Sequence, residues 1–78
     1  MKTRKRPIGT SNIVGANIER IRKERNLKQV EMIAQLQIAG LDINPTSYSK
    51  LEGQVRMATD KEIYAIAKIL KVDINELF

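Results

Sequence analysis

The fold is decided by residues 44–53, which read Asn-Pro-Thr-Ser-Tyr-Ser-Lys-Leu-Glu-Gly. Asn44 followed by Pro45 predicts a helix start, because an asparagine side chain can cap the first amides and proline fits the first helical position. Gly53 predicts the end, since glycine is common just past the last helical residue. The stretch therefore predicts a short helix over residues 45–52.

The two faces of this expected helix differ in chemistry. Tyr48 and Leu51 share an inner face, whereas short polar side chains and one lysine lie outside it: Thr46, Ser47, Ser49 and Lys50. A helix enters the DNA major groove only if its outward side chains permit close approach and can hydrogen-bond base edges. A polar helix that merely faces water shows the same pattern, so periodicity alone leaves both interpretations open.

Helical spacing continues on both sides, and no run of four or more residues alternates as a half-buried strand would. A helix over residues 12–25 would be capped by Ser11 or Asn12 and stopped at Asn26. Its expected buried stripe consists of Val14, Ile18 and Ile21. A second helix over residues 29–39 would end at Gly40. Its expected buried residues are Met32, Ile33 and Leu36.

The C-terminal part continues the pattern. After a connector over residues 41–43 and a loop over residues 54–58, the capping-box spacing of residues 59–62 predicts a fourth helix. Its expected buried stripe consists of Ile63, Ile66, Ala67 and Leu70. A last short helical turn is expected from residue 73 to the end. Five helices with brief connections predict an all-α globule.

The composition limits the class of protein. A chain of 78 residues makes one small domain, and 42% hydrophobic with 29% charged residues is typical of a soluble globular protein. With no Cys and no His, disulfides, Cys/His zinc sites, thiol nucleophiles and imidazole bases are excluded. The carboxylates are dispersed, and no phosphate loop or metal-ligand spacing is present. We therefore expect no enzyme, no metal and no cofactor.

The charge is unevenly distributed. Residues 1–28 hold nine basic and two acidic residues, a net charge of +7, whereas residues 29–78 hold five basic and seven acidic residues, a net charge of −2. This asymmetry favours a polyanionic partner, although a solvated face and a tail would produce it too. Residues 1–10 are expected to form a basic flexible arm, and residues 11–78 the domain. The arm would either contact phosphates non-specifically or be a tail without a defined site.

Three segments resemble the phage-repressor and Cro-like helix-turn-helix (XRE) family of DNA-binding transcriptional regulators. Residues 18–29 (IERIRKERNLKQ) resemble its opening, residues 48–52 (YSKLE) the end of its recognition helix, and residues 66–78 (IAKILKVDINELF) its closing segment. The resemblance covers residues 13–78. It implies a compact five-helix lambda-repressor-like DNA-binding domain.

The resemblance also implies roles for individual residues. Base reading is expected from Asn44, Thr46, Ser47 and Lys50. Lys50 is the expected guanine reader, because an ammonium group can donate to O6 and N7. Phosphate contacts are expected from Gln29, Arg22, Ser49 and Arg56, although plain solvation is the alternative for Gln29 and Arg56.

Two further pairs have implied structural roles. Arg22 and Glu52 stand where family members pair an arginine with a glutamate across two helices, which implies a structural ion pair. Leu77 and Phe78 are candidates for the pairing surface of a homodimer, and their alternative role is to close the core.

The chain departs from the family pattern around the turn. The departures are Lys28 in place of a Ser or Thr cap, Ile33 in place of a small residue, Gln37 in place of glycine, and Pro45 at a position that often reads a base. Residues 37–41 look inserted. The turn between the second and third helices is therefore expected to be longer than usual.

These observations predict sequence-specific binding of double-stranded DNA by a transcriptional regulator of repressor type. The helix starting near Pro45 would read the major groove of an operator, with the protein a homodimer at least on DNA. The alternative is a protein-interaction module on the same fold, antitoxin-like or regulator-binding. The longest apolar run has five residues and no signal peptide is visible, so we expect no membrane partner and a cytoplasmic, nucleoid-associated protein of bacterial or phage type. No small-molecule ligand domain is expected.

Overall fold

The computed structural model describes residues 11–78, and within this range it contains helices and no strands. The elements are α1 (Gly15–Glu24), α2 (Gln29–Ile38), α3 (Pro45–Glu52), α4 (Asp60–Leu70) and the 3₁₀ helix η1 (Ile74–Leu77). The all-α prediction is confirmed, but the count of five helices is corrected to four α-helices and one 3₁₀ turn, because the closing segment is too short for an α-helical ladder. The basic arm expected over residues 1–10 lies outside the described residues.

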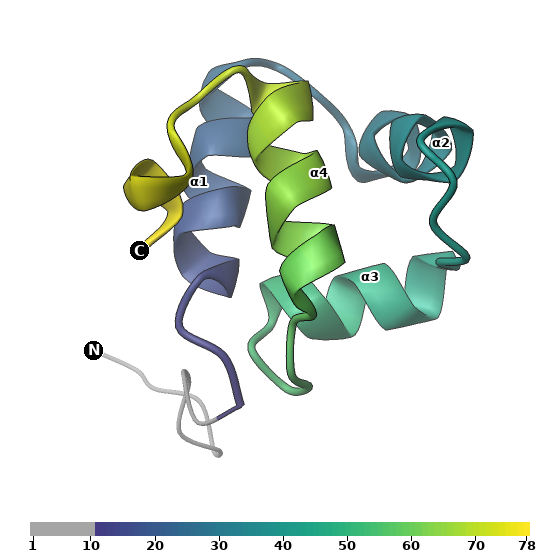
Figure 1. The fold of residues 1–78 in the computed structure, drawn as a ribbon, viewed down its shortest axis with the longest axis horizontal. Coiled ribbons are helices and arrows are strands. Elements are labelled where there is room, and N and C mark those ends of the chain that lie inside the picture. The colour runs from purple at the N-terminus through teal and green to yellow at the C-terminus, as the bar shows by residue number, and fades with distance from the viewer. Residues whose placement is uncertain (1–10) are drawn as a thin grey trace.

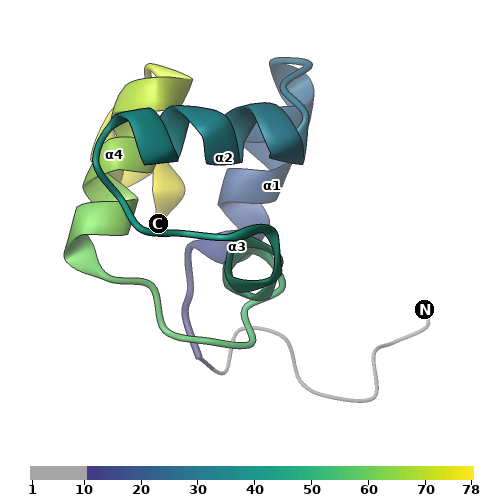
Figure 2. The same ribbon diagram turned by 90° about the vertical axis from the view of Figure 1, so that its right-hand side faces the viewer.

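The helices pack around a central pair. α1 and α4 lie side by side, with η1 on one side of them and α2 on the other (Figure 1). α3 crosses beneath this group and contacts both α1 and α2. In the view at right angles, α2 runs across the front of α1 and α4, with α3 below it (Figure 2). α2 and α3 therefore form a neighbouring pair at one side of the domain.

One hydrophobic core joins all five elements. Its fully buried side chains are Val14, Ile18, Met32, Leu36, Tyr48, Leu51, Ile66, Leu70 and Leu77. The predicted stripes of the first three helices are all buried, whereas Ile63 of the fourth is only partly buried. Ile43 was expected in a connector but is a core residue, 4% exposed. No helix among residues 11–78 is long and apolar enough to cross a membrane.

The start of α1 depends on a contact with α3. Asn12 accepts hydrogen bonds at Oδ1 from the amides of Val14 and Gly15, at 3.1 and 2.8 Å. Its Nδ2 donates to the carbonyls of Leu51 and Arg56, at 3.0 and 2.8 Å. The helix begins at residue 15 rather than 12, because the asparagine is held by the end of α3 and lies outside the helix.

Gly15 lets α1 and α3 approach closely. A Cβ atom at this position would lie 2.4 Å from the carbonyl oxygen of Leu51 and 2.7 Å from that of Glu52. Both distances are far below normal contact, and both atoms belong to the backbone. The role of this glycine was not predicted from the sequence, because the contact joins segments that are distant in sequence.

The ends of α3 and α4 follow the predicted capping signals. Asn44 Oδ1 accepts the amide of Ser47 at 2.8 Å, with Pro45 at the first helical position. Thr59 and Glu62 form the reciprocal capping box of α4, with amide-to-side-chain distances of 2.9 and 3.1 Å. After α2, Gly40 takes a left-handed backbone with φ 98°. The predicted boundary of α3 is confirmed at both ends.

Candidate nucleic-acid interface

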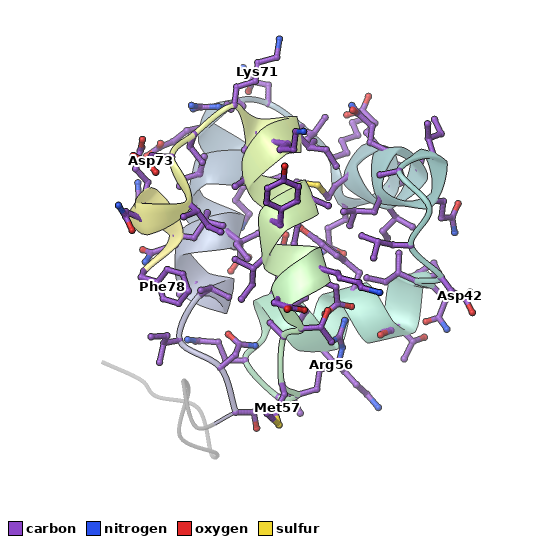
Figure 3. The ribbon with its side chains drawn as sticks, in the orientation of Figure 1. Asp42, Arg56, Met57, Lys71, Asp73 and Phe78 are labelled. Carbon is purple, nitrogen blue, oxygen red and sulfur yellow. The ribbon has the colours of Figure 1, made fainter. Side chains whose placement is uncertain are left out.

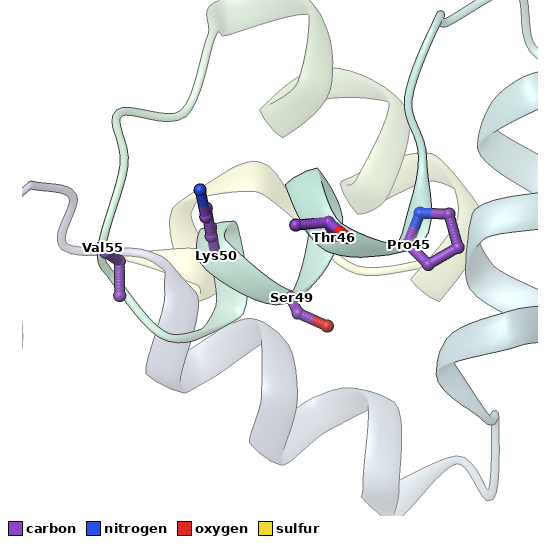
Figure 4. Close-up of a pocket in the computed structure, with 5 residues that line it drawn as sticks. All are labelled: Pro45, Thr46, Ser49, Lys50 and Val55. Carbon is purple, nitrogen blue, oxygen red and sulfur yellow. The ribbon is translucent and has the colours of Figure 1, made fainter.

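The outer face of α3 presents the polar side chains that the sequence predicted. Thr46, Ser49 and Lys50 are exposed, and Ser47 is half-buried. Figure 4 shows three of these along the helix, between Pro45 at its start and Val55 beyond its end. Together the five residues line a shallow, open hollow of about 400 Å³. This face is free of large side chains apart from Lys50, so a flat or convex surface can approach it closely.

The opposite face of α3 is fixed by a buried ion pair. Arg22 Nε and Nη2 donate to the two carboxylate oxygens of Glu52, at 2.7 and 3.1 Å. The two residues are only 6% and 3% exposed. The contact joins α1 to the last residue of α3, which is the structural arrangement that the family resemblance implied for this pair.

Two more side chains complete this cluster. The hydroxyl of Tyr48 donates to Glu52 at 2.5 Å, and the amide of Gln29 donates to the same carboxylate at 3.0 Å. Burial, together with the hydrogen bond to Glu52, raises the pKa of Tyr48 and keeps its phenol a donor. The hydrogen bond to Glu52 likewise raises the pKa of Arg22, so its charge persists. The carboxylate thus joins α1, α2 and α3 through four hydrogen bonds.

Gln29 connects this cluster to the surface. Its Oε1 accepts a hydrogen bond from the hydroxyl of Ser49 at 3.2 Å, while its amide nitrogen binds Glu52. Gln29 is half-buried at the first residue of α2, and Ser49 is exposed on α3. Two of the expected phosphate-binding residues therefore lie together, where the start of α2 meets the outer face of α3.

Arg22 does not lie at this surface. Besides its two bonds to Glu52, its Nη1 donates to the carbonyl of Leu27 at 2.7 Å. All three guanidinium nitrogens are therefore used inside the protein. A phosphate contact from Arg22, as the resemblance implied, is not compatible with this arrangement, and its role is structural.

Arg56 braces the end of α3 against α4. It follows α3 (Figure 3), and its Nε donates to the carbonyl of Ser47 at 2.9 Å. Its Nη1 and Nη2 donate to the carboxylate of Glu62 at 3.0 and 2.8 Å, and Nη1 also donates to the carbonyl of Met57. These hydrogen bonds tie α3 to the start of α4, and the phosphate contact expected from Arg56 stays a prediction.

The same brace perturbs Glu62. Burial alone would raise the pKa of this carboxyl, but hydrogen bonds from Arg56 and Thr59 outweigh it and hold the pKa below its ordinary range. The carboxylate form is therefore the one that the fold stabilises.

The two candidates for a dimer surface lie in different environments. Leu77 is completely buried, and it closes the core between α1, α4 and η1. This burial agrees with the alternative role expected for Leu77, which was to close the core. Phe78 is 60% exposed and lines a small hollow with Ile13 and Met57, which are 64% and 75% exposed.

A family model for the helix-turn-helix domain matches residues 15–78. The chain belongs to this family. The matched range includes every helix of the structure, and it places the chain in the XRE-like helix-turn-helix group. No match was found among curated proteins or among solved structures.

Membership in the helix-turn-helix family indicates DNA binding and a role in transcription regulation. The turn between α2 and α3 runs over residues 39–44 and is held by a hydrogen bond from Gln37 Nε2 to the carbonyl of Ile43 at 2.9 Å. Within residues 11–78, no group of three or more His, Cys, Asp or Glu side chains could hold a metal ion.

Two contacts of the site were not predicted from the sequence, namely the hydrogen bonds that Tyr48 and Gln29 donate to Glu52. One signal was available, because Tyr48 and Glu52 are four residues apart and therefore neighbours on one helix face. Nothing in the sequence signalled the pairing of Arg56 with Glu62.

Proposed function

We propose that this chain is a sequence-specific regulator of repressor type that binds double-stranded DNA and reads the major groove with α3. The observation that carries this proposal is the exposed outer face of α3, which combines hydroxyl groups, one ammonium group and no bulky side chain. The buried carboxylate cluster on its inner face supports the proposal, because a reading helix must be held rigidly.

The side chains of this face suit particular groups on DNA. Lys50 donates to O6 and N7 of guanine, and Thr46 and Ser47 bind either base edge or, through the threonine methyl, a thymine methyl. Asn44 uses its oxygen for the cap but can still donate from its amide nitrogen. These four residues remain the proposed base readers.

Phosphate contacts are proposed for Ser49 and Gln29 together. The hydroxyl of Ser49 lies 3.2 Å from Gln29 Oε1, beside the first turn of α2. The N-terminal end of a helix favours an anion. A phosphate there would lie next to the reading helix, and it would fix the register of α3 on the duplex.

We further propose that the protein binds as a two-fold dimer, since one domain of this size contacts few base pairs. The proposed surface consists of Ile13, Met57 and Phe78, whose exposed side chains surround one hollow. Sedimentation of the protein with a palindromic site should give two chains per duplex, and Met57→Glu should reduce this to one. A 1:1 complex of the unaltered chain on such a site would contradict the dimer.

The experiment that tests the function starts with selection of binding sites from a random DNA pool. The unaltered protein should bind the selected duplex much more tightly than random duplex, with an affinity that falls steeply as salt rises. Lys50→Ala should lower the preference for the selected site by about tenfold or more. Lys61→Ala, which removes the same charge on α4, is the matched control and should keep that preference.

The alternative function gives a different result. A protein-interaction module on the same fold would show no enriched site, and its DNA binding at low salt would be absent or nearly independent of salt. Equal losses from Lys50→Ala and Lys61→Ala on selected and random duplex would also contradict base reading by α3.

A further inference from the structure

The lengthened turn after α2 builds a groove against α4. Residues 39–41 line one side of it, and residues from Lys61 to Ile69 line the other. The groove has a volume of about 450 Å³. The turn, which departs from the family pattern, therefore forms a groove that plays no part in DNA reading by α3.

The floor of the groove is apolar. It is formed by Ala39, Leu41, Ala65 and Ile69. Three of these pack against the core from the outside and are only partly buried, so each leaves apolar surface open to the groove. Ile38, the residue before Ala39, is 85% exposed. Apolar surface gathered in a concave site is typical of a place where another molecule binds.

The rim of the groove is basic. Lys61 and Lys68 both line it, and their spacing of seven residues places them about two helical turns, or ~10 Å, apart on one side of α4. Between them, Tyr64 is 60% exposed, and the ammonium of Lys68 lies 5.1 Å from the centre of its ring. No acidic side chain lines the groove. The rim therefore attracts carboxylates.

We propose that this groove binds an acidic amphipathic helix of a partner protein. The apolar side chains of the partner would lie on the floor, and its carboxylates would pair with Lys61 and Lys68. A helix fits because the lining along α4 is about two to three turns long, the reach of anchors spaced i, i+3, i+4 and i+7.

The chemistry of the groove favours a peptide over nucleic acid. A duplex presents a charged, hydrated backbone and gains nothing from an apolar floor. The groove also shares no residue with the outer face of α3. The inference therefore goes beyond the proposed function, and the domain would hold DNA and the partner at the same time.

A designed peptide tests this proposal. The probe is a synthetic amphipathic peptide of roughly 14 residues, with leucine on one helix face and glutamate on the other. Added to isotope-labelled full chain, it should produce saturable NMR shift changes at residues 39–41 and 64–69. A peptide in which lysine replaces each glutamate should produce none.

Matched variants locate the interaction. Lys61→Glu/Lys68→Glu should weaken binding of the acidic peptide about tenfold or more, whereas Arg20→Glu/Lys23→Glu, the same charge change on α1, should not. Circular dichroism and urea unfolding show that the variants are folded.

Several results would overturn the proposal. These are the absence of saturable shifts at millimolar peptide, equal shifts with the lysine peptide, and no effect of Lys61→Glu/Lys68→Glu. If the NMR shifts of the groove residues changed with protein concentration alone, the groove would bind a second copy of the chain. If duplex DNA changed these shifts, the groove would bind DNA. Either would also contradict the proposal, and none of these results depends on whether α3 reads bases.

Discussion

Replacing the buried carboxylate of Glu52 by an amide should destabilise the domain strongly. In the native structure this carboxylate accepts four hydrogen bonds, two from Arg22 and one each from Tyr48 and Gln29. In Glu52→Gln the side chain has nearly the same shape, but an NH₂ group replaces one carboxylate oxygen. This hydrogen-bond donor would face the donors of the neighbouring side chains. The guanidinium of Arg22 also remains buried without a counter-charge.

The expected loss is about 3–5 kcal/mol, the range measured when one partner of a buried ion pair is removed. A domain of this length has a free energy of unfolding of about 4–12 kcal/mol. The variant should therefore lose about a quarter or more of its stability. Its melting temperature should fall by ~12 °C or more, since about 1 kcal/mol shifts a small domain by 4–8 °C.

Urea unfolding followed by circular dichroism measures this loss. The matched control is Glu24→Gln, which breaks the exposed Arg20–Glu24 pair at 3.3 Å and should change stability by less than about 1 kcal/mol. Adding Arg22→Met to Glu52→Gln removes the stranded charge and should restore part of the stability. A loss from Glu52→Gln no larger than the control's, or no recovery in the double variant, would refute this reasoning.

Three further predictions concern the contacts that support α3. Gly15→Ala places a Cβ 2.4 Å from the carbonyl oxygen of Leu51. Urea unfolding should therefore show that the free energy of unfolding falls by about 1–3 kcal/mol or more. An unchanged free energy of unfolding would contradict the close approach of α1 to α3. Asn44→Ala removes the cap of α3 and should cost about 0.5–2 kcal/mol in the same assay, whereas a neutral effect would show that the cap is dispensable. The pKa of Glu62 is lowered by folding, so its brace with Arg56 contributes stability above the ordinary glutamate pKa of about 4.3, and this contribution is lost as pH falls below that value. Melting temperatures measured from pH 7 to pH 3 should fall less for Glu62→Gln than for the unaltered chain, and parallel curves would contradict the shift.

The sequence predicted the helices whose ends depend on neighbouring residues. Both bounds of α3 were correct. Asn44 and Pro45 act locally at its start through capping and backbone preference, whereas at its end Gly53 keeps a helical backbone (φ −77°) and the left-handed residue is Gln54 (φ 63°). The capping box of α4 was correct for the same reason. The buried stripes of α1 and α2 also followed from helical period alone.

Contacts between distant segments could not be predicted in this way. Asn12 lies outside α1 because its amide binds the end of α3, about forty residues away. Leu77 is buried because η1 folds back on α1 and α4, where Asn17 Nδ2 donates to its carbonyl at 3.0 Å. Sequence periodicity carries no information about either contact.

The candidate site likewise has a part that was predictable from local sequence and a part that depends on distant contacts. The outer face of α3 follows from helical period, so its exposed polar residues were predicted. Arg22 and Arg56 were also given phosphate contacts, because both are basic and the family resemblance places them near the interface. Their true environment depends on Glu52 and Glu62, and only the folded structure shows that these carboxylates, together with the carbonyls of Leu27 and Ser47, accept hydrogen bonds from the guanidinium nitrogens.

Methylation interference on the selected duplex tests major-groove reading by α3 most directly. Dimethyl sulfate methylates guanine N7 in the major groove and adenine N3 in the minor groove, so it distinguishes the two faces of each base pair. Methylation of particular guanines within the site should block binding, and Lys50→Ala should lose its sensitivity at one of them. Interference at adenines alone, with guanine methylation tolerated throughout the site, would contradict the account.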